Sequence, residues 1–307
     1  MKRAVYFFCP LPELDVVASN VLGMLHRKLP MQASGLVVDG MDAQYYVDEN
    51  GNRFDFVSCA YYFSHRYEQY LDMACRHFDD YDVAGYINWH GGTGAPDNVL
   101  TVHTIGDVAT GRFAPSRPDY MHMLASAIES GRVAYGLSHF TTQTEATHWS
   151  GAIHGSDPTL IESFRAPLFD IEIGSTPSAW ANPSAAQVLA EALLSVFDDA
   201  PKPKVVLCLG GIHFDPTYSA ALISQEVAIS IGHFLPTIWL TEGDYTAERG
   251  LAMLHHAKST IVGGVDAIVY NDNMPKAVKD CVRDFAVQTG LQLLKHRRLR
   301  TPRDIEW

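Results

Sequence analysis

The segment Val205–Pro216, with the sequence VVLCLGGIHFDP, constrains the fold of this 307-residue chain more than any other. A run of apolar, β-forming residues ends at paired glycines, which is the pattern of a buried strand that stops in a tight turn. Ligands of open α/β sheets bind beyond the carboxyl ends of the strands. His213 and Asp215 follow this turn and are therefore candidate site residues. A strand-to-helix loop in which His213 bonds only to nearby backbone is the alternative.

Strand and helix patterns alternate along the rest of the chain. The predicted strands are Ala4–Cys9, short pieces over Gly35–Val57, Val83–Trp89, Leu100–Thr104, an extended run over Gly136–His148, Leu168–Ile173 and Ala267–Tyr270. The predicted helices are Glu13–Leu29, Ser64–Phe78, Asp119–Ser130, Ser184–Phe197, Ser219–His233, Ala247–Ser259 and Pro275–Thr289. This alternation predicts an α/β fold with a central mixed, mostly parallel sheet covered on both faces. We expect a single domain over residues 1–307, in which residues 30–80 can form a peripheral subregion.

The net charge of −12 argues against nonspecific binding to nucleic acid, because the phosphate backbone repels an acidic surface unless basic groups gather locally. One such gathering is present near the C-terminus, and it comprises Lys295, His296, Arg297, Arg298, Arg300 and Arg303. A solvated, charged tail is the simpler interpretation of this run.

The five cysteines are odd in number, widely spread and without C-x-x-C spacing, which disfavours a disulfide framework or a cysteine-rich zinc site. The short apolar run near the N-terminus is broken by Pro10 and Pro12, so it reads as a first strand rather than a signal sequence. No apolar stretch approaches the ~20 residues that span a bilayer. We therefore expect a cytoplasmic protein without a membrane partner.

Four histidines lie at or near the ends of predicted strands: His90 in NWHGG, His103 in LTVHTIGD, His148 in EATHWSG and His213 in GGIHFDP. Imidazoles that different strands bring to one sheet edge can converge on a divalent metal. A carboxylate would complete the ligand shell, and the candidates are Glu172, Asp215 and Glu145. For each single histidine, a structural hydrogen bond is the competing interpretation.

Other polar residues are weaker candidates. His139 and His154 lie in a polar segment and are secondary candidates. His255 and His256 are adjacent on a predicted helix and face different directions, so they form a poor metal site. The chain has no G-x-S-x-G elbow, P-loop or G-x-G-x-x-G motif. The glycine-rich stretch 91–98 lacks a lysine and a helix opening, which favours a rim loop over a phosphate cradle. Cys208 lies inside a strand, where apolar surroundings keep a thiol protonated.

Five segments in the same order resemble the archaeal and plant type of D-aminoacyl-tRNA deacylase. They are LTVHTIGD (100–107), EATHWSG (145–151), FDIEIGSTPSAWANPSAAQVLAEALL (169–194), LGGIHFDPTYSAAL (209–222) and ISIGHFLPTIWL (229–240). The resemblance implies a three-layer α/β/α sandwich like that of the phosphorylase and peptidyl-tRNA hydrolase class, and a bound divalent metal, zinc being expected. It covers roughly residues 83–240.

The resemblance also implies site residues. His103, His148, Glu172, His213 and His233 match histidines and a glutamate of the family motifs. The chain departs from those motifs at Trp149, which replaces a histidine, at Ile212, which replaces a glycine, and at 214–217, where Phe-Asp-Pro-Thr replaces Tyr-Ala-Pro-Arg. These departures put the tRNA substrate in question and affect the expected fold less.

The resemblance implies hydrolysis of the ester between a D-amino acid and tRNA. We expect His103, His148, Glu172, His213 and Asp215 to be catalytic, with His148, Glu172 and His213 as metal ligands. Substrate would contact His90, Gly210, Gly211 and His233, the glycine N–H groups stabilising an oxyanion. Two other functions stay open: a metal-dependent enzyme of the same fold acting on a small amino-acid-derived metabolite, and a noncatalytic binding or dimerisation protein.

Overall fold

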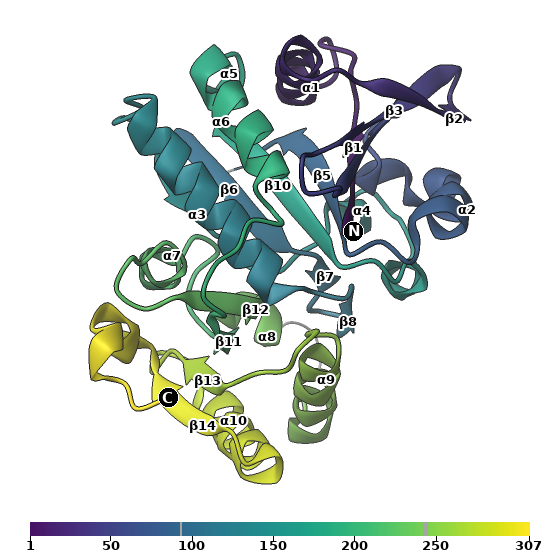
Figure 1. The fold of residues 1–307 in the computed structure, drawn as a ribbon. Helices are drawn as coiled ribbons and strands as arrows, with labels where there is room; N and C mark the ends of the chain where they lie inside the picture. Colours follow the sequence, from purple (N-terminus) through teal and green to yellow (C-terminus); the bar gives the residue numbers. More distant parts are fainter. Residues whose placement is uncertain (93, 242–244) are drawn as a thin grey trace.

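The computed structural model describes residues 1–92, 94–241 and 245–307, and its core is a mixed sheet of eight strands (Figure 1). The strand order is β2-β3-β4-β1-β5-β10-β6-β9, and four of the neighbouring pairs are parallel while β2-β3, β3-β4 and β10-β6 are antiparallel. The strands are β1 (Arg3–Phe8), β2 (Gln32–Val38), β3 (Met41–Val47), β4 (Arg53–Ser58), β5 (Val83–Trp89), β6 (Asn98–Thr104), β9 (Thr141–Gln143) and β10 (Leu168–Ser175).

A second, smaller sheet is entirely parallel and has the order β12-β11-β13-β14. Its strands are β11 (Lys204–Leu209), β12 (Ile229–Leu235), β13 (Ala267–Tyr270) and β14 (Gln292–Lys295). A short hairpin of β7 (Gly106–Asp107) and β8 (Arg112–Phe113) follows β6. The expected mixed, mostly parallel sheet is confirmed, and the structure adds that it is divided into two.

Helices cover both faces of each sheet, which confirms the three-layer α/β/α arrangement (Figure 1). On the large sheet, α1 (Val16–Lys28), α3 (Pro118–Ala134) and α6 (Pro183–Leu194) share one apolar core, and α2 (Tyr67–Phe78) shares another with the opposite face. On the small sheet, α9 (Ala247–Ser259) and α10 (Lys276–Thr289) cover one face, and α7 (Pro216–Leu222) covers the other. The one-turn helices are α4 (Ser150–Ile153), α5 (Pro177–Trp180) and α8 (Thr237–Leu240).

The predicted helix over Ser219–His233 is wrong. Helix α7 ends at Leu222, and Ile229–Leu235 forms the edge strand β12. All seven residues of β12 are buried, including the polar Ser230 and His233, so its polar residues do not mark an exposed face that would distinguish a strand from a helix. Among the described residues, no helix combines the length and apolar character of a membrane span.

The two sheets are joined by the extended segment 144–148. Ala146 N–H donates to the carbonyl of His213 (2.9 Å), and Thr147 N–H donates to that of Phe234 (2.7 Å) in β12. On its other side the segment forms a parallel bridge between His148 and Ile105, directly after β6. The backbone of 144–148 thus bridges the large and small sheets.

The Thr147 hydroxyl is expected to stabilise this junction. It accepts from Phe234 N–H (2.8 Å) and bonds to the Thr104 hydroxyl (2.7 Å), and all of these groups are buried. Thr147→Val keeps the shape but leaves Phe234 N–H without this partner and removes one of the two side-chain bonds of the Thr104 hydroxyl, so we expect urea unfolding to show a loss of about 1–3 kcal/mol. Thr141→Val, an exposed control on β9, should stay within about 0.5 kcal/mol of wild type. Equal stability of the two variants would refute the role of Thr147.

Asp15 makes the stability of helix α1 depend on pH. Its carboxylate caps the helix by accepting from Ala18 N–H (2.9 Å), yet burial raises the pKa of Asp15 to about 7 despite the lowering effect of the backbone N–H groups. Because folding raises the pKa of Asp15, its protonation stabilises the folded state, and this stabilisation is fully present below pH 3.8, the pKa of Asp15 in the unfolded chain. It is lost as the pH rises towards 7, by up to about 1.4 kcal/mol per pH unit.

The neutral variant Asp15→Asn keeps the capping oxygen and removes the titration. Relative to wild type, it should be more stable at pH 8 than at pH 5 in urea unfolding. The matched control is Asp157→Asn, an exposed helix cap at which a hydrogen bond from Thr159 N–H lowers the pKa of Asp157. That control should lose stability relative to wild type only as the pH rises through the unfolded pKa near 3.8, and its difference from wild type should stay constant between pH 5 and pH 8. A pH-independent difference for Asp15→Asn would contradict this account.

Candidate active site

The site begins as a polar face on an otherwise apolar sheet. In β10, Phe169, Ile171 and Ile173 pack into the core beneath α1, α3 and α6, so the alternate residues Asp170 and Glu172 face the opposite side. The pairing of the strands places His103 of β6 directly opposite Asp170. Asn88 of β5 lies opposite Glu172 and donates to Asp170 Oδ1 (2.6 Å). Three neighbouring strands therefore supply buried polar groups to one face.

Glu145, from the segment that joins the two sheets, lies at the centre of the candidate site. Its Oε2 is 2.8 Å from His213 Nε2 and 3.1 Å from His90 Nε2. The carboxylate has no solvent exposure, while the His213 side chain is 36% exposed. His90 is held from its other side by the Ser175 hydroxyl, 2.9 Å from Nδ1. A fully buried carboxylate is thus bonded to two imidazoles, one of which reaches the surface.

His103 and His148 form a second pair beside Glu145. Their rings stack with centroids 4.1 Å apart. His103 Nδ1 lies 3.0 Å from the Thr104 carbonyl, and His148 Nδ1 lies 2.8 Å from the Ala146 carbonyl. A carbonyl only accepts, so the proton of each neutral ring is assigned to Nδ1, which leaves the Nε2 lone pair available. This is how protein backbone commonly orients histidine ligands of metals.

Burial and charge shift the pKa values in the cluster in different directions. Burial alone would raise the pKa of Glu145, but hydrogen bonds from His213 and His90 outweigh it and hold that pKa well below its usual range. Burial, with the carboxylates of Asp170 and Glu145 nearby, raises the pKa of Glu172 well above its usual range. Burial also lowers the pKa of His103 to about 4. The protein alone therefore favours neutral Glu172 and neutral His103 next to a charged Glu145.

The donor set fits a divalent cation. Three overlapping groups have ligand atoms that all lie within 4.8 Å of one another: His90, Glu145 and His213; His103, Glu145 and His148; and His103, Asp170 and Glu172. His103 Nε2, Glu145 Oε1 and Glu172 Oε2 are buried without a hydrogen-bond partner among the described residues. Buried polar atoms normally have a partner, and imidazole with carboxylate is a typical zinc ligand set. These atoms are therefore available as ligands for a cation.

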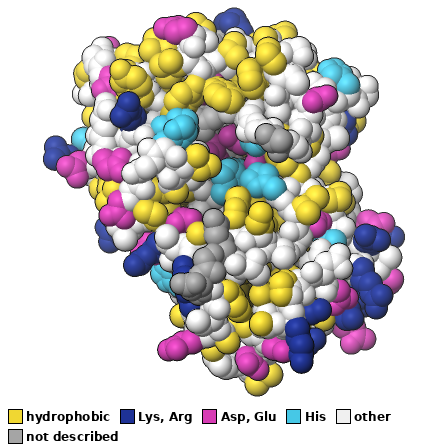
Figure 2. Space-filling view, turned by 180° about the vertical axis from the view of Figure 1, so that it is seen from behind, with side chains coloured by type: hydrophobic (Ala, Val, Ile, Leu, Met, Phe, Trp, Pro, Cys, Tyr) yellow, Lys and Arg dark blue, Asp and Glu magenta, His cyan; other side chains and the backbone are white. Residues whose placement is uncertain are grey.

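A pocket of about 910 Å³ opens onto this cluster. Figure 2 shows histidine and acidic side chains at the bottom of a hollow with apolar groups at its edge. The floor includes His90, His148 and His213, and the aromatic walls include Phe214 and Trp239. Ile212, which is 67% exposed, stands at the rim. The pocket therefore offers an apolar wall beside a polar floor.

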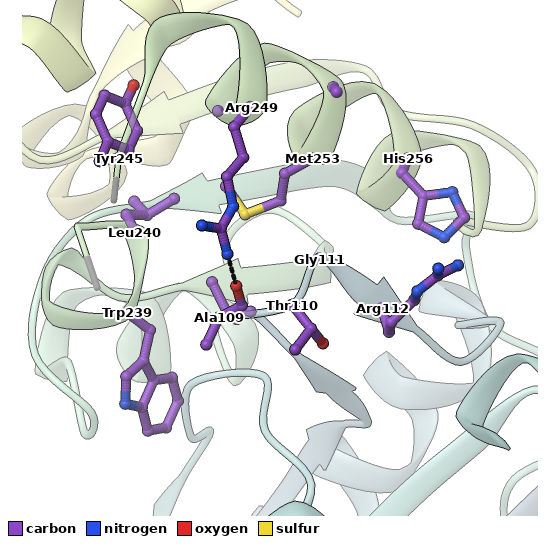
Figure 3. A pocket seen from close by; sticks show the side chains of 13 residues that line it. Ala109, Thr110, Gly111, Arg112, Trp239, Leu240, Tyr245, Arg249, Met253 and His256 are labelled. Carbon is purple, nitrogen blue, oxygen red and sulfur yellow. Dashed lines mark hydrogen bonds between the residues drawn. The ribbon is translucent and has the colours of Figure 1, made fainter. Parts of the chain in front are cut away.

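A smaller cavity of about 250 Å³ adjoins the main pocket and shares Ala109 and Trp239 with it. Figure 3 shows Arg249, from α9, pointing down to the Ala109 carbonyl, to which it donates a hydrogen bond of 2.6 Å. Arg112 and His256 on the far side both bond to Glu162. Since its cationic groups are already bound to protein oxygens, this cavity is an extension of the main pocket rather than a separate anion site.

A sequence profile of the D-aminoacyl-tRNA deacylase family matches residues 77–294. The chain belongs to the D-aminoacyl-tRNA deacylase family. It is 29% identical over 204 residues to such a deacylase from Methanoculleus marisnigri, an alignment that covers 61% of this chain and 39% of the relative. With the deacylase of Pyrococcus furiosus it shares 35% identity over 157 residues, covering 51% of each chain. The chain thus spans about half the length of these curated relatives, or less.

The fold is also that of a solved structure. The crystal structure of a conserved protein of unknown function superimposes with a TM-score of 0.74, at 20% sequence identity, and the match covers 100% of this chain and 98% of that one. The resemblance to the deacylase family expected from the sequence is confirmed.

The structure of this deacylase family member brings five of the candidate residues together: His90, His103, His148, Glu172 and His213. From the sequence, Glu145 was only one of three candidate carboxylates for the ligand shell, and Asp170, Asn88 and Ser175 were not among the predicted site residues. Trp149, which replaces a family histidine, is buried and packs edge-on against Tyr67 at 5.2 Å. Ile212 adds bulk at the rim of the pocket and not among the imidazoles.

Asp215 and His233 lie outside the cluster. Asp215 caps α7 by accepting from Thr217 N–H (2.9 Å) and bonds to His296 Nε2 (2.7 Å), so its catalytic assignment is not supported by its position. His233 is fully buried in β12, where its ring nitrogens bond to the hydroxyls of Thr104 (3.1 Å) and Thr260 (2.9 Å). It makes structural hydrogen bonds and is not among the residues that line the pocket.

The glycine pair does not form an oxyanion hole. Gly210 N–H donates to the Leu235 carbonyl (2.8 Å), and Gly211 N–H donates to the Thr237 hydroxyl (3.0 Å). Both donors are therefore used within the protein. The paired glycines instead allow the backbone to turn, since both have a positive φ, of 79° and 100°.

The weaker candidates also have positions. Burial raises the pKa of the Cys208 thiol well above its usual range, as expected for an inert cysteine. His139 and His154 are exposed, and His255 bonds to Gln288 on the surface of the α9–α10 layer. In the glycine-rich stretch 91–98, Gly91, Gly92, Gly94 and Pro96 line the pocket, as a rim loop would, while Thr93 lies outside the described residues.

Proposed function

We propose that this chain hydrolyses the ester between a D-amino acid and the terminal ribose of tRNA, with a divalent metal bound at Glu145. Family membership supports the reaction class. The observation that carries the proposal is the buried Glu145 carboxylate, surrounded by four imidazoles at the floor of a pocket. The relatives are longer than this chain, which spans only part of them. The assignment of their activity to this chain therefore also needs the geometry of the site.

The metal would be held by Glu145, either with His103 and His148 or with His90 and His213. A neighbouring group, His103 with Asp170 and Glu172, also has its ligand atoms within 4.8 Å of one another. The ligands expected from the sequence, His148, Glu172 and His213, each belong to a different one of the three groups. A bound divalent cation, zinc being the first choice, lowers the pKa of water and polarises the ester carbonyl. The orphaned Glu145 Oε1 and His103 Nε2 are the atoms that such an ion would satisfy.

His213 is the residue best placed to move a proton. It is the exposed member of the cluster, and its Nε2 is bonded to Glu145, which leaves Nδ1 to exchange a proton with water or substrate. As water attacks the acyl carbon, His213 would accept the water proton and return it to the ribose oxygen when the ester bond breaks. Glu145 would orient the ring and stabilise its charged form, as a buried carboxylate does for a catalytic histidine.

The pocket supports binding of the aminoacyl group. Phe214 packs edge-on against both His90 (5.2 Å) and His213 (5.1 Å), and Trp239 packs edge-on against His213 (5.5 Å). An apolar amino-acid side chain would contact these rings while its ester lies over the polar floor. The convergence of four histidines on one carboxylate favours the hydrolase over a noncatalytic binding protein.

The test is release of amino acid from D-phenylalanyl-tRNA and, in parallel, from L-phenylalanyl-tRNA by the purified chain. We expect enzyme-dependent release from the D form at least about tenfold faster than from the L form, and rates that fall steeply with added salt. Failure to accelerate release from the D form would contradict the proposal. A salt-independent rate would instead favour the alternative, a small amino-acid-derived substrate.

A further inference from the structure

We infer that the basic segment after β14 is a docking surface for the phosphodiester backbone of the RNA whose 3′ end enters the pocket, an inference that rests on the proposed function. The segment forms two turns of 3₁₀ helix, His296–Arg300 and Pro302–Asp304. It lies beyond residues 77–294, the part of the chain matched by the family profile. The surface is therefore a feature of this chain that the family match does not assign.

The segment is anchored, in contrast to the loose tail expected from its charge. Leu299 and Ile305 are buried in the core that α7 shares with the small sheet. Its cationic side chains are exposed on this fixed support: Lys295, Arg297, Arg298, Arg300 and Arg303. An anchored row of cations loses less conformational freedom on binding than a disordered tail.

Two of these arginines are available to an anion. Lys295 pairs with Asp272 at 3.3 Å, and Arg303 pairs with Glu226 at 3.5 Å, both at exposed positions where such pairs are weak. Among the described residues, neither Arg297 nor Arg300 has a carboxylate within 4 Å. On a chain of net charge −12, these guanidinium groups form a local exception to the acidic surface. Arginine is well suited to bind phosphate because of its forked geometry.

The segment is physically connected to the pocket. His296, directly before Arg297, bonds through Nε2 to Asp215 Oδ1 (2.7 Å) and packs edge-on against Tyr218 of α7 at 4.8 Å. Asp215 lies two residues after His213, and Pro216, the next residue, lines the pocket. Figure 2 shows Lys and Arg side chains gathered at the lower right edge of the face that carries the hollow. A nucleic acid whose end fills the pocket thus reaches this surface with its adjoining backbone.

The test compares the double variant Arg297→Gln/Arg300→Gln with Arg27→Gln/Arg76→Gln. The control removes the same charge from exposed positions on α1 and α2, at the opposite end of the molecule (Figure 1). The substrates are D-phenylalanyl-tRNA and 2′(3′)-O-D-phenylalanyl-adenosine, which has the ester but no phosphodiester. For the first variant, we expect kcat/KM on tRNA to fall about tenfold at low salt, and the slope against log salt concentration to become shallower by about 2.

Its kcat/KM on the adenosine ester should equal that of wild type, and the control should match wild type on both substrates. Unchanged activity on tRNA, or equal losses on both substrates, would overturn the docking surface. If wild type hydrolyses neither ester, the proposed function fails, and the surface is judged by binding of uncharged tRNA. Weaker binding by the Arg297/Arg300 variant than by the control would then support it, and equal binding by the two variants would overturn it.

Discussion

Replacing Glu145 by glutamine is expected to lower kcat/KM for D-phenylalanyl-tRNA by about 1,000-fold or more. The substitution keeps the shape of the side chain but removes the charge that bonds to both His90 and His213. It also removes an anionic ligand shared by two of the three donor groups. Loss of one central charge should therefore affect both the proton-transferring histidine and metal binding.

A matched control is available at Glu162. That carboxylate also bonds to one histidine and one basic partner, His256 (2.6 Å) and Arg112 (2.9 Å), but it lies outside the cluster. Glu162→Gln should retain activity within about twofold of wild type, as expected for partly exposed pairs of modest energy. Circular dichroism and thermal melting of both variants would establish that each is folded. Comparable activity of the Glu145 and Glu162 variants would contradict the assignment.

Removal of metal is expected to abolish activity and to lower Tm by roughly 5 °C. A ligand at 100 times its Kd stabilises the folded state by about 2.7 kcal/mol, and a chain of this size shifts by about 2 °C per kcal/mol. The physical cause would be that buried ligand atoms such as His103 Nε2 and Glu145 Oε1, which have no hydrogen-bond partner among the described residues, lose the ion proposed to bind them.

The measurement is dialysis against a chelator, with metal content, Tm and activity followed together before and after Zn²⁺ is restored. The Glu145→Gln variant should show a smaller change in Tm on chelation, because its affinity for the ion is already reduced. Restoration of both Tm and activity by about stoichiometric Zn²⁺ is expected. Full activity of a chain shown to be free of metal would contradict the metal-assisted reaction.

Local patterns were sufficient to predict much of the architecture. The apolar run before Gly210 is β11, and the predicted helix Ala247–Ser259 has the bounds of α9. The strand β12 was misassigned because all of its residues are buried, which removes the periodicity on which such predictions depend. The division into two sheets was also not predictable, since it depends on which strands pair, and paired strands such as β6 and β10 are far apart in the chain.

The candidate site was only partly predictable, for a related reason. Strand-end position identified His90, His103 and His213, but the central role of Glu145 comes from the backbone bonds that hold its segment between the sheets. One signal in the sequence was available and not used. Asp215 precedes Pro216, and Asp followed by Pro is the pattern of a helix N-cap with proline at the first helical position. That pattern assigns Asp215 to α7 and not to chemistry.

Cleavage of the ester at the Glu145 cluster is the central claim. The most direct measurement is single-turnover hydrolysis of D-phenylalanyl-tRNA with enzyme in excess and saturating, so that the rate reports the chemical step. The account predicts a rate for Glu145→Gln about 1,000-fold or more below that for Glu162→Gln. Equal rates for the two variants would show that cleavage takes place elsewhere.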